Sequence, residues 1–483
     1  MKSLGCLDMD SLKEEFEAKD GMEFPGKTYV DALLKHVFYD QKEHLFQAMF
    51  LIHRAHTTML AEQHIISEQE ADLIIKGIKE VEKMETAGLD YSAEFEDLFF
   101  LVESQIGKII GDELAGKMHI AKSRNDMGEA MYRIVIRDYI TSAAQEAENL
   151  KEALLYQAEQ HIKSIMPAHT HTQPAQPTTF AHYLLAITDN LDRDIKRLTN
   201  AYQTVNKSPM GAAAITTSGF PINRERVAEL LDFDGVVENS YDAIGTADYL
   251  IEAAQALISL MTNMGRWIQE FLRMASKEVG LLKVSDAYVQ ISSIMPQKRN
   301  PVSIEHSRAL ASSAAGEGMT VVHMIHNTPY GDINDTEDDL QPHLYKGYRK
   351  GIRVLRLMRA VVLTMEFNRE RAFQQARENM ITITELADVL TRDYGLSFRK
   401  AHHQASIIAK KTDAAGKELY EISLEKINDW LEGVQLKKED WQQIIDPACF
   451  VERRRVTGGP NQDLVKEMIR SRKGDFSKKS DRV

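Results

Sequence analysis

Hydrophobic residues recur along the middle of the chain in alternating steps of four and three positions. This spacing, a period of about 3.5 residues, indicates long helices that pack along their length at small crossing angles. Three such stripes are Ile136, Ile140, Ala143, Ala147, Leu150 and Leu154; Leu184, Ile187, Leu191, Ile195, Leu198, Tyr202 and Val205; and Leu250, Ala254, Leu257, Met261, Met264, Ile268 and Phe271. No strand pattern is comparably strong, so the sequence predicts an all-α fold around a long-helix bundle, with a minor hairpin near residues 207–222.

Changes in this pattern suggest three helical domains. Residues 1–122 are expected to form an N-terminal helical domain and residues 123–373 the central long-helix bundle. Residues 374–483 are expected to form a C-terminal helical domain.

Composition narrows the class of protein. A net charge of −13 over 483 residues argues against nucleic acid as a partner, because nucleic-acid binders usually carry a basic face. No apolar run reaches the roughly 18 residues of a membrane span. Two cysteines, Cys6 and Cys449, provide neither a disulfide framework nor a metal-ligand cluster. The sequence therefore predicts a cytoplasmic protein without a membrane or nucleic-acid partner.

Three polar segments interrupt the helical pattern, each at the start of a helix. They are residues 122–126, 168–173 and 292–301. We expect the first helix to run to about residue 165, the second to start near Pro177, and the third to start with Asn300 as N-cap and Pro301 as its first residue. Helix N-termini attract anions, so the three segments together suggest a substrate with several carboxylates.

Simpler interpretations exist for each segment. Ser123, Asn125 and Thr172 could act only as helix caps, and residues 292–301 could be a solvated basic loop. His169 and His171 could bind a metal, but no cysteine or suitably spaced His-Glu pair completes such a site.

The three segments resemble known sequence motifs. SSIMPQKRNP at Ser292 resembles the signature loop of the fumarase, aspartase and argininosuccinate lyase superfamily. KSRNDM and THTQPAQP resemble the argininosuccinate lyase versions of the other two regions. Residues 384–403 and the TGGP at Thr457 resemble that family's C-terminal part, so the similarity covers nearly the whole chain.

The resemblance implies an elimination that breaks a carbon–nitrogen bond in an N-substituted aspartate and releases fumarate. Ser292 would be the base, His171 the acid, Glu305 the partner of His171, and Lys298 the countercharge for the substrate carboxylate. A serine hydroxyl is a poor base unless its alkoxide is stabilised, which Lys298, nearby backbone N–H groups and the following helix could do. No metal or organic cofactor is needed. The substrate-binding residues implied are Ser123, Arg124, Asn125, Thr170, Gln176, Ser293 and Asn300.

Departures from the family fall on the amine side of the substrate. Family polar positions there are occupied by Met49, His53, Phe99 and Val102, and a family loop is replaced by Tyr330–Asp339. The acidic residues Asp332, Asp335, Glu337, Asp338 and Asp339 could hold a guanidinium.

Three functions therefore remain open. The leading one is cleavage of argininosuccinate to arginine and fumarate, as in arginine biosynthesis. The second is a sister lyase of the ethylenediamine-disuccinate (EDDS) lyase kind, which uses another amine. The third is a structural protein like the δ-crystallins.

The expected length of the first long helix also predicts an oligomer. A helix from Arg124 to about residue 165 would be roughly 57 Å long, with Arg124 at one end and His171 beyond the other. The sequence therefore predicts a homotetramer whose active sites are shared between subunits, as the resemblance also implies.

Overall fold

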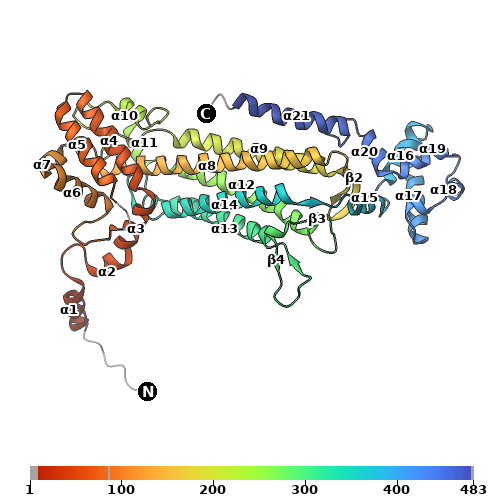
Figure 1. Cartoon of the computed structure of the whole chain (residues 1–483), viewed down its shortest axis with the longest axis horizontal. Coiled ribbons are helices and arrows are strands. Elements are labelled where there is room, and N and C mark those ends of the chain that lie inside the picture. Colours follow the sequence, from red (N-terminus) through yellow and green to blue (C-terminus); the bar gives the residue numbers. More distant parts are fainter. Residues whose placement is uncertain (1–8, 85–87, 480–483) are drawn as a thin grey trace, which may run out of the picture. The chain divides into compact units, whose positions relative to one another are not determined.

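The structure is a computed structural model that describes residues 9–84 and 88–479 (Figure 1). Most of these residues are helical, and the strands among them form three two-stranded sheets. The predicted all-α class is therefore confirmed. The chain divides into two compact units, whereas the predicted division into three domains stays a prediction.

Five long helices contribute segments to both units. They are α8 (Arg124–Gln160), α9 (Phe180–Val205), α12 (Asp248–Met274), α13 (Val302–Ile325) and α14 (Gln341–Thr364). The three predicted stripes lie on α8, α9 and α12, and every member is buried except the half-buried Tyr202. The spacing of apolar residues therefore identified the core-facing side of each helix.

Unit 1 comprises the described part of Met1–Ala144, together with Lys196–Ser259 and Ser313–Gly351. Its shorter helices are α1 (Met9–Asp20), α2 (Lys27–Tyr29), α3 (Lys35–His44), α4 (Phe46–Glu62), α5 (Glu68–Glu82), α6 (Leu98–Ile110), α7 (Asp112–Lys117), α10 (Arg224–Leu230) and α11 (Ser240–Gly245), with a π-helix at Val30–Leu34 and a 3-10 turn at Asn334–Thr336. Its core includes the buried rings of Tyr249, Tyr345 and Tyr348. The Tyr348 hydroxyl donates to the Ala253 carbonyl at 2.8 Å, which satisfies a polar group inside the core.

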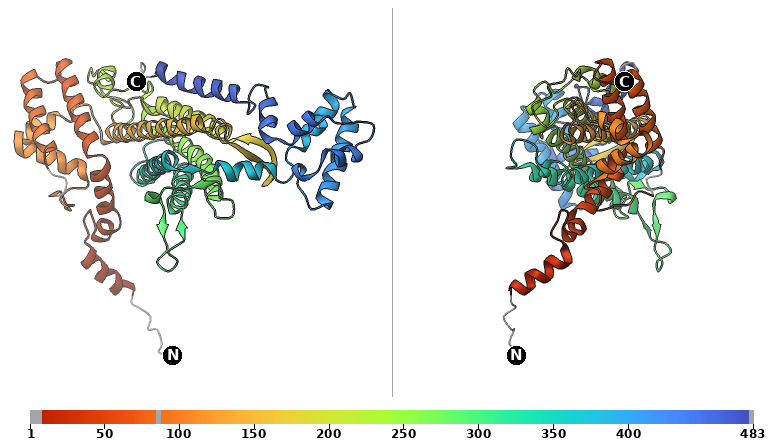
Figure 2. Two further views of the ribbon diagram at one scale, coloured as in Figure 1. Left: turned by 45° about the vertical axis from the view of Figure 1, so that its right-hand side comes forward. Right: turned by 90° about the vertical axis from the view of Figure 1, so that its left-hand side faces the viewer.

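Unit 2 comprises Gln145–Ile195, Leu260–Ser312 and the described part of Ile352–Val483. Its antiparallel strand pairs are β1 (Ile165–Thr170) with β2 (Gln173–Thr179), β3 (Leu282–Lys283) with β6 (Glu366–Phe367), and β4 (Gln290–Ile291) with β5 (Arg299–Asn300). Figure 2 shows β4 and β5 as a projecting hairpin.

The remaining helices of unit 2 follow the bundle segments. They are α15 (Arg369–Arg377), α16 (Ile383–Arg392), α17 (Phe398–Ala414), α18 (Leu424–Trp430), α19 (Lys438–Ile445), α20 (Pro447–Arg453) and α21 (Gln462–Lys479), with 3-10 turns at Asp286–Tyr288 and Leu419–Glu421. Helices α16 to α19 enclose an apolar cluster that includes Leu390, Ile408 and Ile444. The Phe180 and Phe367 rings stack at 4.1 Å where α9 begins.

The predicted hairpin near residues 207–222 is wrong. This stretch has no strand pair, and its backbone N–H groups are used elsewhere: Ser208 N–H donates to the Gly235 carbonyl, while Gly211 and Ala213 donate to the Asp126 carboxylate. Other N–H groups of the segment form local turns, such as Thr217 with the Ala212 carbonyl, so these donors are not available for a hairpin ladder. A hairpin that the sequence analysis did not predict is formed by β1 and β2 in unit 2.

Two helix boundaries also differ from the prediction. Helix α8 ends at Gln160 rather than near residue 165, because His161 and Ser164 form a turn in which Ser164 N–H donates to the His161 carbonyl. Helix α9 begins at Phe180 rather than near Pro177, since Pro177 lies within β2 and pairs with Pro167. Among the described residues we find no helix with the length and apolar character that crossing a membrane requires.

Candidate active site

The first polar segment lies in unit 1, where α8 begins. The Ser123 carbonyl accepts the Met127 N–H, so Ser123 is the N-cap, and its Oγ accepts the Asn125 N–H at 3.3 Å. Ser123 Oγ also donates to Asn125 Oδ1 at 3.0 Å. The capping interpretation is thus correct for Ser123, and capping also orients the Asn125 side chain.

Arg124 is surrounded by acidic and aromatic groups. Its guanidinium donates to Asp97 at 2.8 Å and lies 3.5 Å from Glu96, and it packs over the Phe100 ring. The side chain is 42% exposed, so it remains accessible from solvent. Asn125 Nδ2 donates to the Ala214 carbonyl at 3.3 Å.

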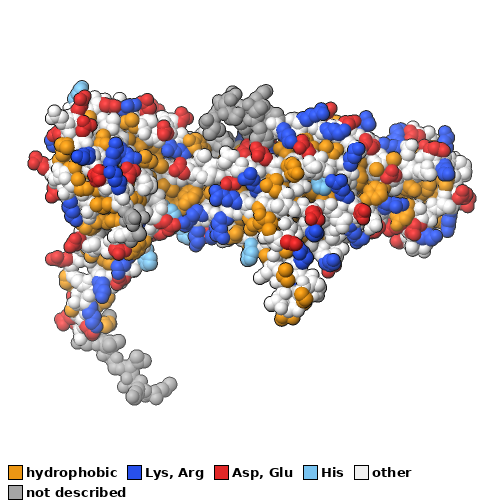
Figure 3. Space-filling view, in the orientation of Figure 1, with side chains coloured by type: hydrophobic (Ala, Val, Ile, Leu, Met, Phe, Trp, Pro, Cys, Tyr) orange, Lys and Arg blue, Asp and Glu red, His pale blue; other side chains and the backbone are white. Residues whose placement is uncertain are grey.

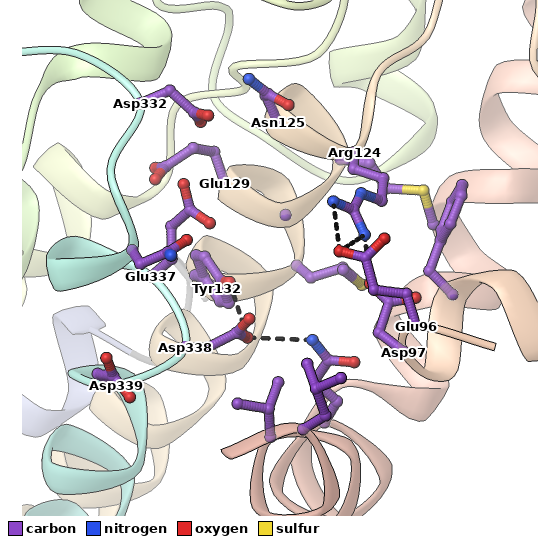
Figure 4. Close-up of a pocket in the computed structure, with 18 of the residues that line it drawn as sticks. Glu96, Asp97, Arg124, Asn125, Glu129, Tyr132, Asp332, Glu337, Asp338 and Asp339 are labelled. Carbon is purple, nitrogen blue, oxygen red and sulfur yellow. Dashed lines mark hydrogen bonds and ion pairs between the residues drawn. The ribbon is translucent and has the colours of Figure 1, made fainter. Parts of the chain in front are cut away.

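A cavity of about 200 Å³ opens beside Arg124 and Asn125, entirely within unit 1 (Figure 4). Seven carboxylates line it: Glu96, Asp97, Glu129, Asp332, Glu337, Asp338 and Asp339. In Figure 4 the side chains of Glu129, Asp332 and Glu337 point toward one another. We call this cavity the acidic pocket.

Burial controls the protonation of the acidic pocket. It raises the pKa of Glu129 to about 7, although Arg133 and a 2.9 Å hydrogen bond from the Tyr249 hydroxyl favour the ionised form. Burial, with the neighbouring Asp332, also raises the pKa of Glu337. Like charges that have lost solvent are stabilised by a cation, so the pocket is electrostatically suited to a positively charged group. Among the described residues there is no cluster of acidic, histidine or cysteine side chains arranged to hold a metal ion.

The second polar segment is the tip of the β1–β2 hairpin in unit 2. His171 and Thr172 form its two-residue turn, with φ values of 50° and 64°, and both side chains are exposed. Positive φ at both central positions is the geometry that a tight hairpin turn requires. Thr170 is the last residue of β1, and Gln176 on β2 donates to Thr384 at 3.5 Å. The segment is therefore a hairpin turn rather than a loop before a helix.

The third polar segment is the loop between β4 and β5. Ser292 Oγ accepts two backbone hydrogen bonds, from Ile294 N–H at 3.3 Å and from Met295 N–H at 3.1 Å. The Ser292 N–H donates to the Lys298 carbonyl at 3.3 Å, which closes the base of the loop. Ser292 is half-buried, whereas Ser293 and Lys298 are exposed.

Hydrophobic side chains gather at the tip of this loop. Ile294 is 86% exposed, and Ile291 and Met295 are also exposed. They form the orange patch on the projecting hairpin in Figure 3. An apolar tip of this kind is more stable when another surface covers it.

The start of α13 differs from the prediction by one residue. Pro301, not Asn300, is the N-cap, because the Pro301 carbonyl accepts the Glu305 N–H at 3.3 Å. Asn300 pairs with Gln290 as the last residue of β5, which keeps its backbone extended. Glu305 is exposed in the first turn of α13, and in the described part of unit 2 no hydrogen bond joins it to His171.

The structure thus brings some candidate residues together. Arg124 and Asn125 line the acidic pocket, and Ser123 precedes them in the chain. Of the expected acidic residues only Asp335 does not line the pocket. His171 and Ser292 lie on separate hairpins of unit 2. Glu129 and Asp97 were missed by the sequence analysis. Glu129 lies four residues after Asn125 on α8, and that helical spacing was the available signal.

The fold and the matched family model define the protein as a lyase. A model described as "Lyase" matches residues 29–316, and one described as "Argininosuccinate lyase C-terminal" matches residues 380–452. The chain is 40% identical to argininosuccinate lyase 2 of Agrobacterium fabrum, over 94% of this chain and 92% of that relative. It is 34% identical to the argininosuccinate lyase of Methanocaldococcus jannaschii, over 88% and 87% of the two chains.

Solved structures agree with these matches. Structures of EDDS lyase, one of a variant with bound fumarate and one in complex with formate, share 30% identity with this chain and give a TM-score of 0.84. Each alignment covers 92% of this chain and 90% of the other. The chain belongs to the argininosuccinate lyase family, which confirms the resemblance seen in the sequence.

Proposed function

We propose that this protein eliminates an amine from an N-substituted aspartate and releases fumarate, with argininosuccinate, which yields arginine, as the leading substrate. The observation that carries the proposal is the pair of backbone N–H groups directed at Ser292 Oγ. Two such donors stabilise negative charge on this oxygen, and a serine base needs that stabilisation. The chain also keeps every candidate catalytic residue, namely Ser292, Lys298, His171 and Glu305. Their presence argues against a structural protein of the δ-crystallin kind.

In the proposed reaction Ser292 removes a proton from the carbon next to a substrate carboxylate. Lys298 and Asn300 hold that carboxylate as charge develops on it. The carbon–nitrogen bond then breaks, and His171, with Glu305 as its partner, supplies the proton that leaves with the amine. The position of His171 at the tip of the β1–β2 turn supports this role, since its exposed imidazole is accessible to a substrate.

The remaining candidate residues would bind the succinyl part. Ser123, Arg124 and Asn125 are consecutive at the start of α8, where the helix dipole favours an anion. Thr170, Gln176 and Ser293 would complete the contacts. No metal or organic cofactor enters this chemistry.

The acidic pocket supports a cationic amine as the leaving group. It adjoins Arg124 and Asn125, so a substrate whose carboxylates bind there would place its amine substituent beside Glu129 and Asp338. A guanidinium satisfies this requirement. Another charged amine would also satisfy it. The apolar side chains of Met49 and Phe99 in the pocket wall favour a sister lyase of the EDDS lyase kind as the second candidate.

The length of α8 supports a homotetramer with shared sites. Its 37 residues correspond to about 55 Å, with Arg124 as the first residue and the His171 turn after the last. One succinyl group cannot contact residues from both ends of such a helix within one chain. Association of several chains would bring the two kinds of segment together. A cytoplasmic location is consistent with the free thiol of Cys449 and stays a prediction.

Fumarate addition to a panel of amines would test the amine assignment. Arginine, other cationic amines and a neutral amine of similar size are each incubated with fumarate, and fumarate consumption is followed by its absorbance. Arginine as the best acceptor would support argininosuccinate as the substrate. A clear preference for another cationic amine would select the sister-lyase function, and no addition to any amine would contradict both.

A further inference from the structure

The carboxylate of Asp126 connects two separate segments of unit 1. Its Oδ1 accepts the Ser123 N–H at 2.9 Å, and its Oδ2 accepts the N–H groups of Gly211 at 2.9 Å and Ala213 at 3.0 Å. The side chain is completely buried. One carboxylate thus satisfies three backbone donors that otherwise would be buried without partners.

The loop containing Gly211 and Ala213 has no regular structure of its own. Both residues have positive φ, 80° and 52°. Arg224 holds the other side of this loop, donating to the Met210 carbonyl at 2.9 Å and to the Val237 carbonyl at 2.9 Å. The loop is therefore held by the half-buried Arg224 on one side and the buried Asp126 on the other.

This loop in turn contacts a candidate substrate-binding residue. Asn125 Nδ2 donates to the Ala214 carbonyl, one residue beyond the Asp126 contact. Displacement of residues 211–214 would therefore move the Asn125 amide, and with it the hydrogen bond between Asn125 and Ser123.

Lys122 supplies a buried positive charge next to this arrangement. Its side chain is fully buried, and its Nζ lies 2.9 Å from His53 Nδ1 and 4.0 Å from Glu103. Burial lowers the pKa of Lys122 to about 8, while Glu103 and Asp126 favour its charged form. Burial likewise raises the pKa of Asp126 to about 6, against the three N–H donors and Lys122. Two buried charges of opposite sign thus flank the Ser123–Asn125 segment.

We propose that Asp126 and Lys122 are positioning residues, which fix Ser123, Arg124 and Asn125 as a preformed set of contacts for the succinyl carboxylate. The proposal rests on the proposed function. Neither residue needs to touch the substrate. Their effect arises because Asp126 sets the direction of the Ser123 N–H and the position of the 211–214 loop against Asn125.

The Asp126→Asn variant tests this inference. An asparagine amide has one acceptor oxygen, so either the Ser123 side or the Gly211 side would face an NH₂ group, and two donors would meet. Misplacement of binding groups by about 1 Å can cost roughly 100-fold. We expect KM for the substrate and the Kd for fumarate, measured by calorimetry on the intact protein, both to rise at least about tenfold. Lys122→Met is expected to change both constants in the same direction by a smaller factor.

Asp138→Asn is the matched control. Asp138 is an exposed carboxylate on the same helix, and none of the described residues donates a hydrogen bond to it. This variant should leave both constants within about twofold of the original protein. Melting temperature is measured for all variants, because a merely structural role would lower it without changing KM or Kd.

Unchanged KM and fumarate Kd in Asp126→Asn, with or without a lower melting temperature, would overturn the inference. If Asp126→Asn does not fold, unchanged constants in Lys122→Met would overturn it instead. The proposed function fails separately, when the original protein neither releases fumarate nor adds an amine to it. Fumarate binding still decides the positioning role in that case, and a protein that does not bind fumarate contradicts it.

Discussion

Ser292 is the residue on which the proposed chemistry depends most. We expect Ser292→Ala to lower turnover by roughly 100- to 10,000-fold, because a positioned base contributes about that much to the rate. Folding should be unaffected, since Ser292 lies in an exposed loop and its Oγ only accepts local N–H groups. Steady-state fumarate release and the melting temperature measure the two effects.

Ser312→Ala is the matched control for this change. Ser312 is an exposed serine on α13 whose hydroxyl donates to the Arg308 carbonyl, outside the candidate site. It should retain the original turnover. Near-normal turnover in Ser292→Ala would rule out the assignment of Ser292 as base.

The acidic pocket yields a prediction at Asp338. This carboxylate accepts from Gln41 at 3.1 Å and Tyr132 at 3.4 Å, and lines the cavity beside Glu337. We expect Asp338→Asn to raise KM for a cationic amine about tenfold in the addition reaction, since a buried charge-assisted contact contributes about 1.5–3 kcal/mol. KM for fumarate should change less than about twofold.

Asp335→Asn provides the comparison, because Asp335 is in the same acidic stretch but does not line the pocket. It should leave both constants unchanged. Equal effects of the two substitutions would show that the charge of the stretch, rather than the pocket, determines amine affinity.

Buried histidines of unit 1 predict how stability depends on pH. Burial lowers the pKa of His56 to about 3, and that of His53 well below its usual value. His56 Nε2 contacts the Ile120 carbonyl, while Nδ1 has no partner in the described chain, which fits a neutral ring. Below about pH 6.5 the folded protein therefore binds fewer protons than the unfolded chain. The contribution of the neutral ring to the free energy of unfolding is complete above that pH and is lost as the pH falls toward 3.

Acidification lowers the free energy of unfolding of the original protein. We expect this decrease to be smaller in His56→Gln, by about 1.4 kcal/mol per pH unit between about pH 6 and 4. Chemical denaturation at constant protein concentration measures this slope. His402→Gln, which changes an exposed histidine of α17, should have the same slope as the original protein. An unchanged slope in His56→Gln would mean that His56 is protonated in the folded state.

At the scale of elements, sequence predicts what local spacing determines. The stripes on α8, α9 and α12 were found because a helix buries residues at fixed intervals. The β1–β2 hairpin was not found, since its turn residues, His171 and Thr172, are not the Asn-Gly type that signals such turns. Long-range hydrogen bonds also determine the structure of residues 207–222. The N–H groups of Gly211 and Ala213 in this stretch bind Asp126, about 85 positions earlier in the chain.

The same distinction applies to the candidate site. Motifs identified Ser123–Asn125, His171 and Ser292, because each is a continuous run of residues. The partners of Glu129 could not be identified in that way. Tyr249, which donates to it, is 120 positions away, and burial of the pair depends on how α8 and α12 pack. Sequence therefore indicates the segments of the site, while the environment that sets their pKa values comes from the fold.

At the scale of the whole molecule, shared active sites predict complementation. Arg124→Ala and Ser292→Ala are expected to be inactive alone. When they are unfolded and reassembled together, some sites in mixed oligomers would take Arg124 from one chain and Ser292 from another, so part of the activity should return. Fumarate release by the reassembled mixture measures the recovery.

Ser292→Ala mixed with Lys298→Met is the control pair. Both positions lie in one loop of one chain, so every site would carry one of the two changes and no activity should return. Light scattering establishes that mixed oligomers have formed. A fully active monomer, or no recovery for the first pair in verified mixed oligomers, would contradict shared sites.

Release of fumarate from argininosuccinate by the purified protein is the most direct measurement of the central claim. We predict that fumarate and arginine appear in equal amounts and that both are absent with Ser292→Ala. Fumarate at the same rate from Ser292→Ala would contradict the mechanism. No fumarate from argininosuccinate, together with no addition of any cationic amine to fumarate, would contradict the assignment of this chain as a fumarate-releasing lyase.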